Sequence, residues 1–386
     1  MDTARFTKTA PGRLVPIRLR GQALMAFVPN DLSPAVPEQG LVLDALARAA
    51  RALGYLAGQI ASTPAAPTTA ALFAVREVVF SSRIEGVDVE PCAVVAAYGL
   101  DGRTRARLRL PPAADEVVRA LRGQALGLAL ARQRRISRAA LRRVHAVLFD
   151  APSGASKGRG RFRAIQNWVG RAGLGPETAN YVPPPVPEMR LGLAALERFM
   201  QRAEAEPLIS VALTHYQFEA LHPFIDGNGR VGRILNLMSL ARRGVLPAPL
   251  ISPSASFWEH RDGYFEQLLA VSQTGAWAPW IRYMLARLTE AATDASTRLG
   301  RVLDLRAAWA EQLERDTRSR KSVAIVDLVL RQPVLTRAIV ERELGLSRRA
   351  AMQQLARMAR LNIIQRMELA GQEQVFACEP VLALMG

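Results

Sequence analysis

The pattern of apolar and polar positions along the chain is mostly helical. Apolar residues recur at three- and four-residue spacing, helix-forming Ala, Leu, Arg and Glu dominate, and runs of β-branched residues are few. Such spacing is typical of amphipathic helices. It predicts helices over about 38–62, 67–84, 90–99, 113–132, 136–149, 187–205, 207–221, 229–243, 257–274 and 276–316. We therefore expect a mostly α fold.

Two segments depart from this helical pattern. Residues 1–37 contain five prolines, whose spacing excludes long helices and predicts an extended arm that wraps a surface. Residues 165–170 and 181–185 are short and strand-like, and polar turn residues and a run of three prolines bound them. This arrangement predicts a β-hairpin.

The pattern changes again from about residue 320. Short helices are predicted over 322–330 and 336–344, and Ser347 is a suitable N-cap for a third that reaches about residue 360. Residues 363–366 and 374–377 then form two strand-like stretches around a turn at Gly371. Three helices followed by a two-stranded wing predict a winged helix-turn-helix.

The composition gives the chain a strong positive net charge. The 386 residues are 49% apolar, enough for two or three domains, and 51 Lys and Arg face 34 Asp and Glu, for a net charge of +17. An anionic partner would explain this charge, whether nucleotide, nucleic acid or an acidic protein face. A genome that encodes Arg where others encode Lys would explain the high Arg content equally well, so both interpretations stay open.

Cysteine content and hydropathy bear on the cellular compartment. The two cysteines lie far apart, which argues against a disulfide scaffold and against a zinc site. The first residues lead into no apolar run of the kind that forms a signal peptide, and no uncharged stretch is long enough to span a bilayer. We expect a cytoplasmic protein with no membrane partner.

One segment, residues 222–233, concentrates groups suited to chemistry at phosphorus. Pro223 disfavours helical geometry at His222, which ends the preceding helix. Glycines at 227 and 229 permit a tight turn and close approach of a ligand. The next helix opens near Gly229, where unpaired N–H groups and the positive end of the helix dipole attract an anion.

The charged residues of this segment and His222 supply the remaining groups that chemistry at phosphorus requires. Arg230 and Arg233 lie one helical turn apart and can reach the same anion. Asp226 precedes the glycine turn, where a carboxylate can hold Mg²⁺ against phosphate oxygens. An imidazole such as that of His222 can accept a proton near neutral pH. A base, a metal ligand and an anion cradle together suit displacement at phosphorus.

The segment resembles the signature of the Fic family, His-x-Phe-x-Asp-Gly-Asn-Gly-Arg-x-x-Arg, at every typed position. Flanking stretches at 214–219, 260–265 and 275–277 are also similar, and the resemblance covers about residues 20–300. It implies a Fic-type helical bundle that transfers AMP from ATP to a Ser, Thr or Tyr hydroxyl of a target protein, and to itself.

The resemblance also implies roles for individual residues. His222 would be the general base, and Asp226 would bind Mg²⁺ on the α- and β-phosphates. The segment 165–185 would be a flap that clamps the target as an added strand. The remaining residues would contact the nucleotide: Gly227, Asn228 and Gly229 at the anion hole, Arg230 and Arg233 on the phosphates, and Gln217, Tyr264 and Phe265 along the border.

A second string, Ser81 to Gly86, is informative beside this loop. Ser81 and Glu85 share one face near the end of a helix, and Gly86 is a suitable C-cap. Alone, the string is typical of a surface Glu on a capped helix. It also resembles the family's inhibitory motif, [Ser/Thr]-x-x-x-Glu-[Gly/Asn], which implies that Glu85 pairs with Arg233 in the place of the ATP γ-phosphate and inhibits the enzyme from within the chain.

These readings divide the chain into an N-terminal arm with the inhibitory helix (1–110), a Fic catalytic core (111–300), and a linker helix with the winged helix (301–386). The winged helix carries arginines that could bind DNA, or it could dock a protein or a second copy of the chain. A nucleotide-sensing DNA-binding regulator is therefore the alternative function. Within enzymes, transfer of UMP or phosphocholine, or removal of AMP, also stays open.

Residues outside the two motifs have simpler interpretations. His145, His215 and His260 lack metal-ligand spacing and are read as ordinary packed or surface histidines. The arginines of the recognition helix could meet phosphates of DNA, but base-reading Asn and Gln are sparse there. These arginines are Arg348, Arg349, Arg357 and Arg360.

Overall fold

The computed structural model describes residues 1–33, 39–133, 135–151, 154–170, 174–202, 206–316, 322–367 and 374–386. The chain forms two compact units. The first unit consists of residues 1–54, 122–246 and 256–290, and the second of residues 55–121, 247–255 and 291–386. The three-part division predicted from the sequence stays a prediction. Among the described helices, none combines the length and apolar character that crossing a bilayer requires.

The first unit is built from a hairpin and a group of helices. Its elements are β1 (Gly12–Leu19), β2 (Gln22–Pro29), η1 (Thr3–Arg5), η2 (Gln39–Val42), α6 (Arg138–Leu148), η5 (Pro176–Thr178), α7 (Val186–Gln201), α8 (Pro207–Leu221), α9 (Asn228–Arg242) and α11 (Arg261–Thr274). Four helices contribute residues to both units: α1 (Leu43–Ser62), α5 (Pro112–Gln133), α10 (Pro253–Glu259) and α12 (Trp277–Asp316).

One apolar cluster joins several helices of the first unit. It joins buried residues from the end of α5 and from α6, α7, α8 and α9, among them Phe218, Phe224 and Met238. Almost every residue of α8 is buried, and the indole of Trp280 donates to the carbonyl of Ala212 on this helix at 2.9 Å. The α8–α9 pair is therefore fixed on several sides, and the loop between its helices is presented by a rigid frame.

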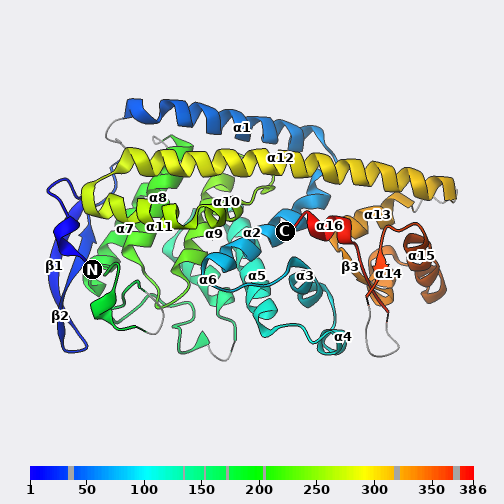
Figure 1. The fold of residues 1–386 in the computed structure, drawn as a ribbon, viewed down its shortest axis with the longest axis horizontal. Helices are drawn as coiled ribbons and strands as arrows, with labels where there is room; N and C mark the ends of the chain where they lie inside the picture. Colours follow the sequence, from blue (N-terminus) through cyan, green and yellow to red (C-terminus); the bar gives the residue numbers. More distant parts are fainter. Residues whose placement is uncertain are drawn as a thin grey trace. The chain divides into compact units, whose positions relative to one another are not determined.

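The N-terminal arm predicted for residues 1–37 is in fact a regular hairpin. β1 and β2 pair antiparallel from Gly12 opposite Pro29 to Leu19 opposite Gln22, and β2 packs against α7 and α8 (Figure 1). Arg20 and Gly21 both have positive φ, 51° and 80°, as a two-residue hairpin turn requires. Pro16 fits within β1 because each strand of a two-stranded sheet has an open edge, where a missing N–H breaks no bond.

The hairpin predicted at 165–170 and 181–185 is reduced to one antiparallel bridge between Val169 and Tyr181. The N–H of Val169 donates to the carbonyl of Tyr181 at 2.8 Å, and the side-chain amide of Gln166 donates to the carbonyl of Pro183 at the same distance. Prolines 183–185 have no N–H, so side chains replace the ladder that two strands would form. Residues 171–173 of the predicted connection lie outside the described residues.

The second unit contains short helices and a small sheet. Its elements are η3 (Ala66–Thr69), α2 (Ala70–Ile84), α3 (Pro91–Gly99), α4 (Gly102–Arg107), α13 (Ser322–Arg331), β3 (Val334–Thr336), α14 (Arg337–Leu344), α15 (Arg348–Arg360), β4 (Gln365–Arg366), β5 (Val375–Ala377) and α16 (Glu379–Ala383). The sheet has the order β3-β5-β4 with antiparallel neighbours.

Most predicted helices are confirmed, and the differences have local causes. The Ser347 hydroxyl caps α15 by accepting from the N–H of Ala350, as expected. The helix predicted over 257–274 is two helices, because His260 leaves helical geometry at φ −119° and ψ 36°. The sheet contains β3, which the sequence did not predict, and the turn at Gly371 lies outside the described residues. The winged helix-turn-helix assignment stays a prediction.

Candidate active site

The predicted site lies on the loop between α8 and α9. His222 ends α8 in the left-handed region, at φ 46° and ψ 60°, while its N–H still donates to the carbonyl of Phe218 at 3.0 Å. A positive φ is uncommon for a residue other than glycine, so the loop holds His222 in a demanding conformation. Gly227, at φ 77°, makes the second turn and precedes α9.

Asn228 holds the middle of the loop together. Its side-chain oxygen accepts from the N–H of Phe224 at 2.8 Å, and its amide donates back to the carbonyl of Phe224 at 2.9 Å. The amide of Asn167 donates to the same carbonyl at 2.9 Å. Asn228 is buried, and these bonds engage both ends of its amide. In this conformation, its side chain shapes the loop that was predicted to bind an anion.

His145, which the sequence reading treated as an ordinary histidine, braces the same loop. The N–H of Gly160 donates to its Nδ1 at 2.9 Å, so Nε2 carries the proton and donates to the carbonyl of Asp226 at 3.0 Å. The ring stacks on Phe224 with centroids 4.0 Å apart. Burial lowers the pKa of His145 to about 4, which keeps it neutral at pH 7.

Arg163 connects the loop to the flap segment. Its backbone N–H donates to the carbonyl of Pro223 at 2.8 Å, and its Nε donates to the carbonyl of His222 at 3.0 Å. The rest of its guanidinium donates to the carbonyls of Ile165 and Pro184. Burial lowers the pKa of Arg163 to about 10, so it is still charged at neutral pH. Beyond a local excess of Gly and Arg, no sequence pattern indicates this role.

Asp226 lies among positive charges. Its Oδ2 is 2.6 Å from the Lys157 ammonium, and its Oδ1 accepts from the N–H of Gly227 at 2.6 Å and lies 3.9 Å from Nη2 of Arg230. Burial raises the pKa of this carboxyl, but the bond and charge of Lys157, with Arg230 and Gly227, outweigh it and hold the pKa below its usual value. Asp226 is ionised at neutral pH.

This donor set fits Mg²⁺ only in company with phosphate. No cluster of three or more acidic, His or Cys side chains suitable for a metal occurs in the part of the chain that the structure describes. Mg²⁺ in nucleotide sites is commonly held by one or two carboxylates and by phosphate oxygens. Asp226, with its side chain 40% exposed, can serve as that single carboxylate.

Arg230 and Arg233 open α9 and are both buried, at 5% and 1% exposure. The guanidinium of Arg230 lies 5.4 Å from the centroid of the Phe149 ring, a cation–π distance. Arg233 is close enough to His215 to add to the effect of burial, which lowers the pKa of His215 to about 3. The two cations are therefore fixed beside the first turn of the helix.

The three residues predicted to border the nucleotide lie in different surroundings. Gln217 is buried and donates to the carbonyl of Asn30, at the end of the hairpin, at 3.0 Å. Tyr264 is buried, and its hydroxyl lies 2.7 Å from Nε2 of His215. Phe265 is 41% exposed, with the Arg261 guanidinium 5.0 Å from its ring centroid. Their contact with a nucleotide stays a prediction.

The inhibitory string lies in the second unit, at the end of α2. The N–H of Gly86 donates to the carbonyl of Arg83 at 2.9 Å and that of Val87 to the carbonyl of Ser82 at 3.0 Å, the pattern of a Schellman C-cap. Gly86 has a φ of 84°, so it ends the helix as predicted. Ser81 is buried and Glu85 is exposed. The pairing of Glu85 with Arg233 stays a prediction.

The upstream half of α2 is tied down by buried charges. Glu77 accepts from the hydroxyl and N–H of Ser254 and from the hydroxyl of Ser252, at 2.5 to 3.1 Å. The buried Arg76 guanidinium contacts the Phe80 ring at 4.6 Å and the Asp294 carboxylate at 3.5 Å. These contacts fix the position of α2 within its unit.

Two of the four arginines on α15 are paired with one carboxylate. Asp316 accepts from Arg360 at 2.8 Å and forms an ion pair with Arg357 at 3.0 Å, whereas Arg348 and Arg349 are exposed at the start of the helix. This pairing reduces the charge that α15 could offer to DNA phosphates.

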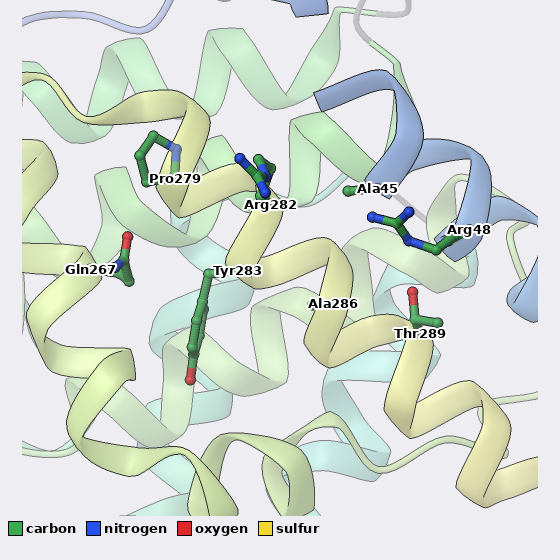
Figure 2. Close-up of a pocket in the computed structure, with 8 residues that line it drawn as sticks. All are labelled: Ala45, Arg48, Gln267, Pro279, Arg282, Tyr283, Ala286 and Thr289. Atoms are coloured by element: carbon green, nitrogen blue, oxygen red, sulfur yellow. The ribbon is translucent and has the colours of Figure 1, made fainter. Parts of the chain in front are cut away.

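Figure 2 shows a pocket of about 360 Å³ in the first unit. It is lined by residues of α1, α11 and α12, including Arg48, Arg282 and Tyr283, and by none of residues 222–233. Tyr283 is engaged, since its hydroxyl donates to the carbonyl of His260 at 3.0 Å. The pocket therefore does not coincide with the loop that carries the predicted chemistry.

The region around this loop is similar to known proteins. Residues 135–240 match the Fic/DOC family. Over 138 residues the chain is 33% identical to the protein adenylyltransferase Fic of Drosophila yakuba, and over 139 residues it is 31% identical to that of Nematostella vectensis. These matches cover 35% of this chain and 24% and 29% of the two relatives, so the chain spans under a third of their length.

A solved structure extends the likeness in fold. The crystal structure of a Fic family protein from Desulfovibrio desulfuricans G20 superposes with a TM-score of 0.57 at 20% identity, over 90% of this chain and 98% of that one. At this identity the likeness concerns the fold alone. The chain thus has a mostly helical Fic fold with a small N-terminal hairpin and a small C-terminal sheet.

Proposed function

We propose that this chain, whose residues 135–240 form a Fic/DOC family domain, transfers AMP from ATP to a hydroxyl group of a target protein. The observation that carries the proposal is the arrangement, on one braced loop and the start of the helix that follows it, of an imidazole, an ionised carboxylate and two buried guanidiniums. The relatives that match this segment are named as protein adenylyltransferases, which supports the same reaction.

The triphosphate would bind where α9 begins. The first N–H groups of α9 have no partner within the helix, and an anion is favoured there by the helix dipole. Gly227 and Gly229 would let the phosphates approach the backbone, while Arg230 and Arg233 would pair with phosphate oxygens. Gln217, Tyr264 and Phe265 would border the nucleotide. Asp226 would hold Mg²⁺ on the phosphates, where the ion supplies neutralising charge.

His222 would then act as the general base. Its imidazole takes the proton from a Ser, Thr or Tyr hydroxyl, and the oxygen of that hydroxyl forms a bond to the α-phosphorus. The bond between the α-phosphorus and the bridging oxygen to the β-phosphate breaks, and pyrophosphate leaves. Arg163 and Asn228 contribute by holding the loop in the geometry that places His222.

The target would be presented by the flap segment. Ile165 is 66% exposed, and Arg163 ties the carbonyls of Ile165 and Pro184 to the carbonyl of His222. An extended stretch of target beside residues 165–170 would therefore lie close to the base, in the manner of strand addition.

Inhibition would come from Glu85 at the end of α2. A carboxylate paired with the Arg233 guanidinium would occupy the place of the γ-phosphate and misalign the triphosphate. Because phosphoryl transfer depends on alignment, this misalignment would reduce the rate by orders of magnitude. The winged-helix assignment of the C-terminal region, with docking of a protein or a second copy, belongs to the same proposal.

Labelled ATP tests the reaction directly. Purified Glu85→Gly protein is incubated with Mg²⁺ and ATP labelled on the α-phosphorus or, in a parallel reaction, on the γ-phosphorus. We expect covalent label from the α-labelled ATP alone. Label from the γ-position would indicate phosphorylation instead, and label from a UTP or CDP-choline donor alone would indicate transfer of UMP or phosphocholine.

A further inference from the structure

Lys157 lies against the one carboxylate that the proposed reaction assigns to the metal. Its ammonium is 2.6 Å from Oδ2 of Asp226 and 5.3 Å from the centroid of the Phe149 ring. The opposite oxygen, Oδ1, is engaged by the N–H of Gly227 and approached by Arg230. Oδ2 is therefore the oxygen at which an incoming cation would bind, and Lys157 already occupies it.

The loop that carries Lys157 is fixed in place. The N–H of Gly160 donates to His145, the carbonyl of Gly160 accepts from Arg142 at 2.8 Å, and Arg159 donates to the carbonyl of Ala146 at 3.1 Å. These bonds attach residues 159–160 to α6. The backbone next to Lys157 is thereby held beside Asp226, and the ion pair is a consequence of the fold.

The two cations next to Asp226 differ in their freedom to move. Arg230 is 5% exposed and is confined by its surroundings. Lys157 is 41% exposed, and its charge sits at the end of a flexible four-carbon stem. A divalent ion at Oδ2 would meet the ammonium at contact distance, where like charges repel strongly. Lys157 can move away from Oδ2 within reach of the same loop, whereas Arg230 cannot.

We propose that Lys157 occupies the metal position of Asp226 when no nucleotide is bound, and that it transfers to the phosphates when the metal enters. The inference rests on the proposed nucleotide site. Its consequence is a coupling between two ligands, a divalent cation and a nucleoside triphosphate. The cation alone competes with Lys157 and binds poorly, whereas phosphates give the ammonium a new partner and leave Oδ2 to the metal.

Mn²⁺ binding in the absence of nucleotide tests this coupling without any turnover. Free Mn²⁺ is measured by electron paramagnetic resonance during titration of the wild type and of Lys157→Met. We expect Lys157→Met to bind Mn²⁺ roughly tenfold more tightly, since the competing charge is gone. Lys8→Met is the matched control, because it removes one exposed lysine charge elsewhere in the first unit and should bind Mn²⁺ as the wild type does.

Two further titrations locate the bound Mn²⁺ and measure the effect of nucleotide on its affinity. Adding Asp226→Asn to Lys157→Met should abolish the gain, which would place the Mn²⁺ at Asp226. A non-hydrolysable ATP analogue should increase Mn²⁺ affinity more in the wild type than in Lys157→Met. If Lys157→Met binds free Mn²⁺ no more tightly than the wild type, or if Asp226→Asn keeps the gain, the inference is overturned.

The outcome also separates this inference from the proposed function. Analogue binding to the wild type with unchanged Mn²⁺ affinity in Lys157→Met would remove the role of Lys157 and leave the nucleotide site standing. An analogue that fails to bind the wild type and both lysine variants would overturn the proposed function, and the inference with it.

Discussion

Two glycine turns of this molecule use the same backbone conformation in different surroundings. Gly227 begins α9 at φ 77°, and Gly86 ends α2 at φ 84°. A Cβ added to Gly227 would lie 2.6 Å from the ring of Phe149, whereas one added to Gly86 would meet no atom within 4 Å. The first turn is enclosed by packing, whereas the second has open space beside its glycine.

This difference in packing distinguishes a loop that is held by surrounding side chains from a helix end that has open space beside its glycine. Around Gly227, the buried side chains of His145, Arg163 and Asn228 all bond to backbone atoms of the loop. Around Glu85, the buried anchors Arg76 and Glu77 lie two turns upstream in α2. A proposed catalytic residue is thus placed by side chains from distant parts of the chain, and a proposed inhibitory residue is exposed at the end of a helix whose last turns are buried.

The largest effect that would test this contrast is removal of Arg163. Arg163→Met would leave the buried carbonyls of His222 and Pro184 without this donor, at a cost of about 4 kcal/mol in the free energy of unfolding. Urea denaturation measures it. The exposed neighbour Arg161 supplies the control, since Arg161→Met should change stability by less than about 0.5 kcal/mol. Equal effects of the two variants would contradict the bracing role.

Alanine at the two glycines compares the turns directly. Gly227→Ala combines a left-handed backbone with overlap against Phe149, and we expect a loss of about 3 kcal/mol and loss of nucleotide binding. Gly86→Ala carries the backbone cost alone, about 1 kcal/mol. Paired denaturation curves and calorimetric nucleotide titrations measure both. Equal losses of stability would mean that packing around Gly227 does not matter.

The buried His145, which braces the loop around Gly227, makes the stability of the protein sensitive to acid. Its pKa is about 4 in the folded protein and about 6.5 in an unfolded chain, so between these values the unfolded state binds more protons. Stability is complete above pH 6.5 and falls as the pH decreases, by about 2 kcal/mol from pH 7 to pH 5 for this residue. His145→Gln should flatten the profile by that amount, and parallel profiles would refute the assignment.

The groups of the candidate site follow from the sequence, but the residues that position them do not. The motif at 222–233 is local, so spacing alone brings His222, Asp226 and Arg230 together. His145, Lys157 and Arg163 contact the same loop from 59 to 81 residues away along the chain, and no periodicity marks such contacts. The sequence therefore does not distinguish His145 from an ordinary packed histidine.

The fold, too, follows from the sequence only where the pattern is local. Helix positions follow from apolar spacing, and most were predicted to within a few residues. The five prolines of residues 1–37 predict an extended arm and do not indicate the N-terminal hairpin, in which Arg20-Gly21 makes a tight turn between residues that pair. The opposite error occurred at 165–185, where strand-like residues form only the Val169–Tyr181 bridge, because prolines and side-chain bonds replace the ladder.

Intact-mass spectrometry of four proteins tests the central claim most directly: the wild type, Glu85→Gly, His222→Ala and the double variant, each incubated with ATP and Mg²⁺. We predict that Glu85→Gly gains the mass of one or more adenylyl groups, that the wild type gains far less, and that both proteins with His222→Ala gain none. An adenylyl group on the double variant, or equal modification of the wild type and Glu85→Gly, would contradict the account.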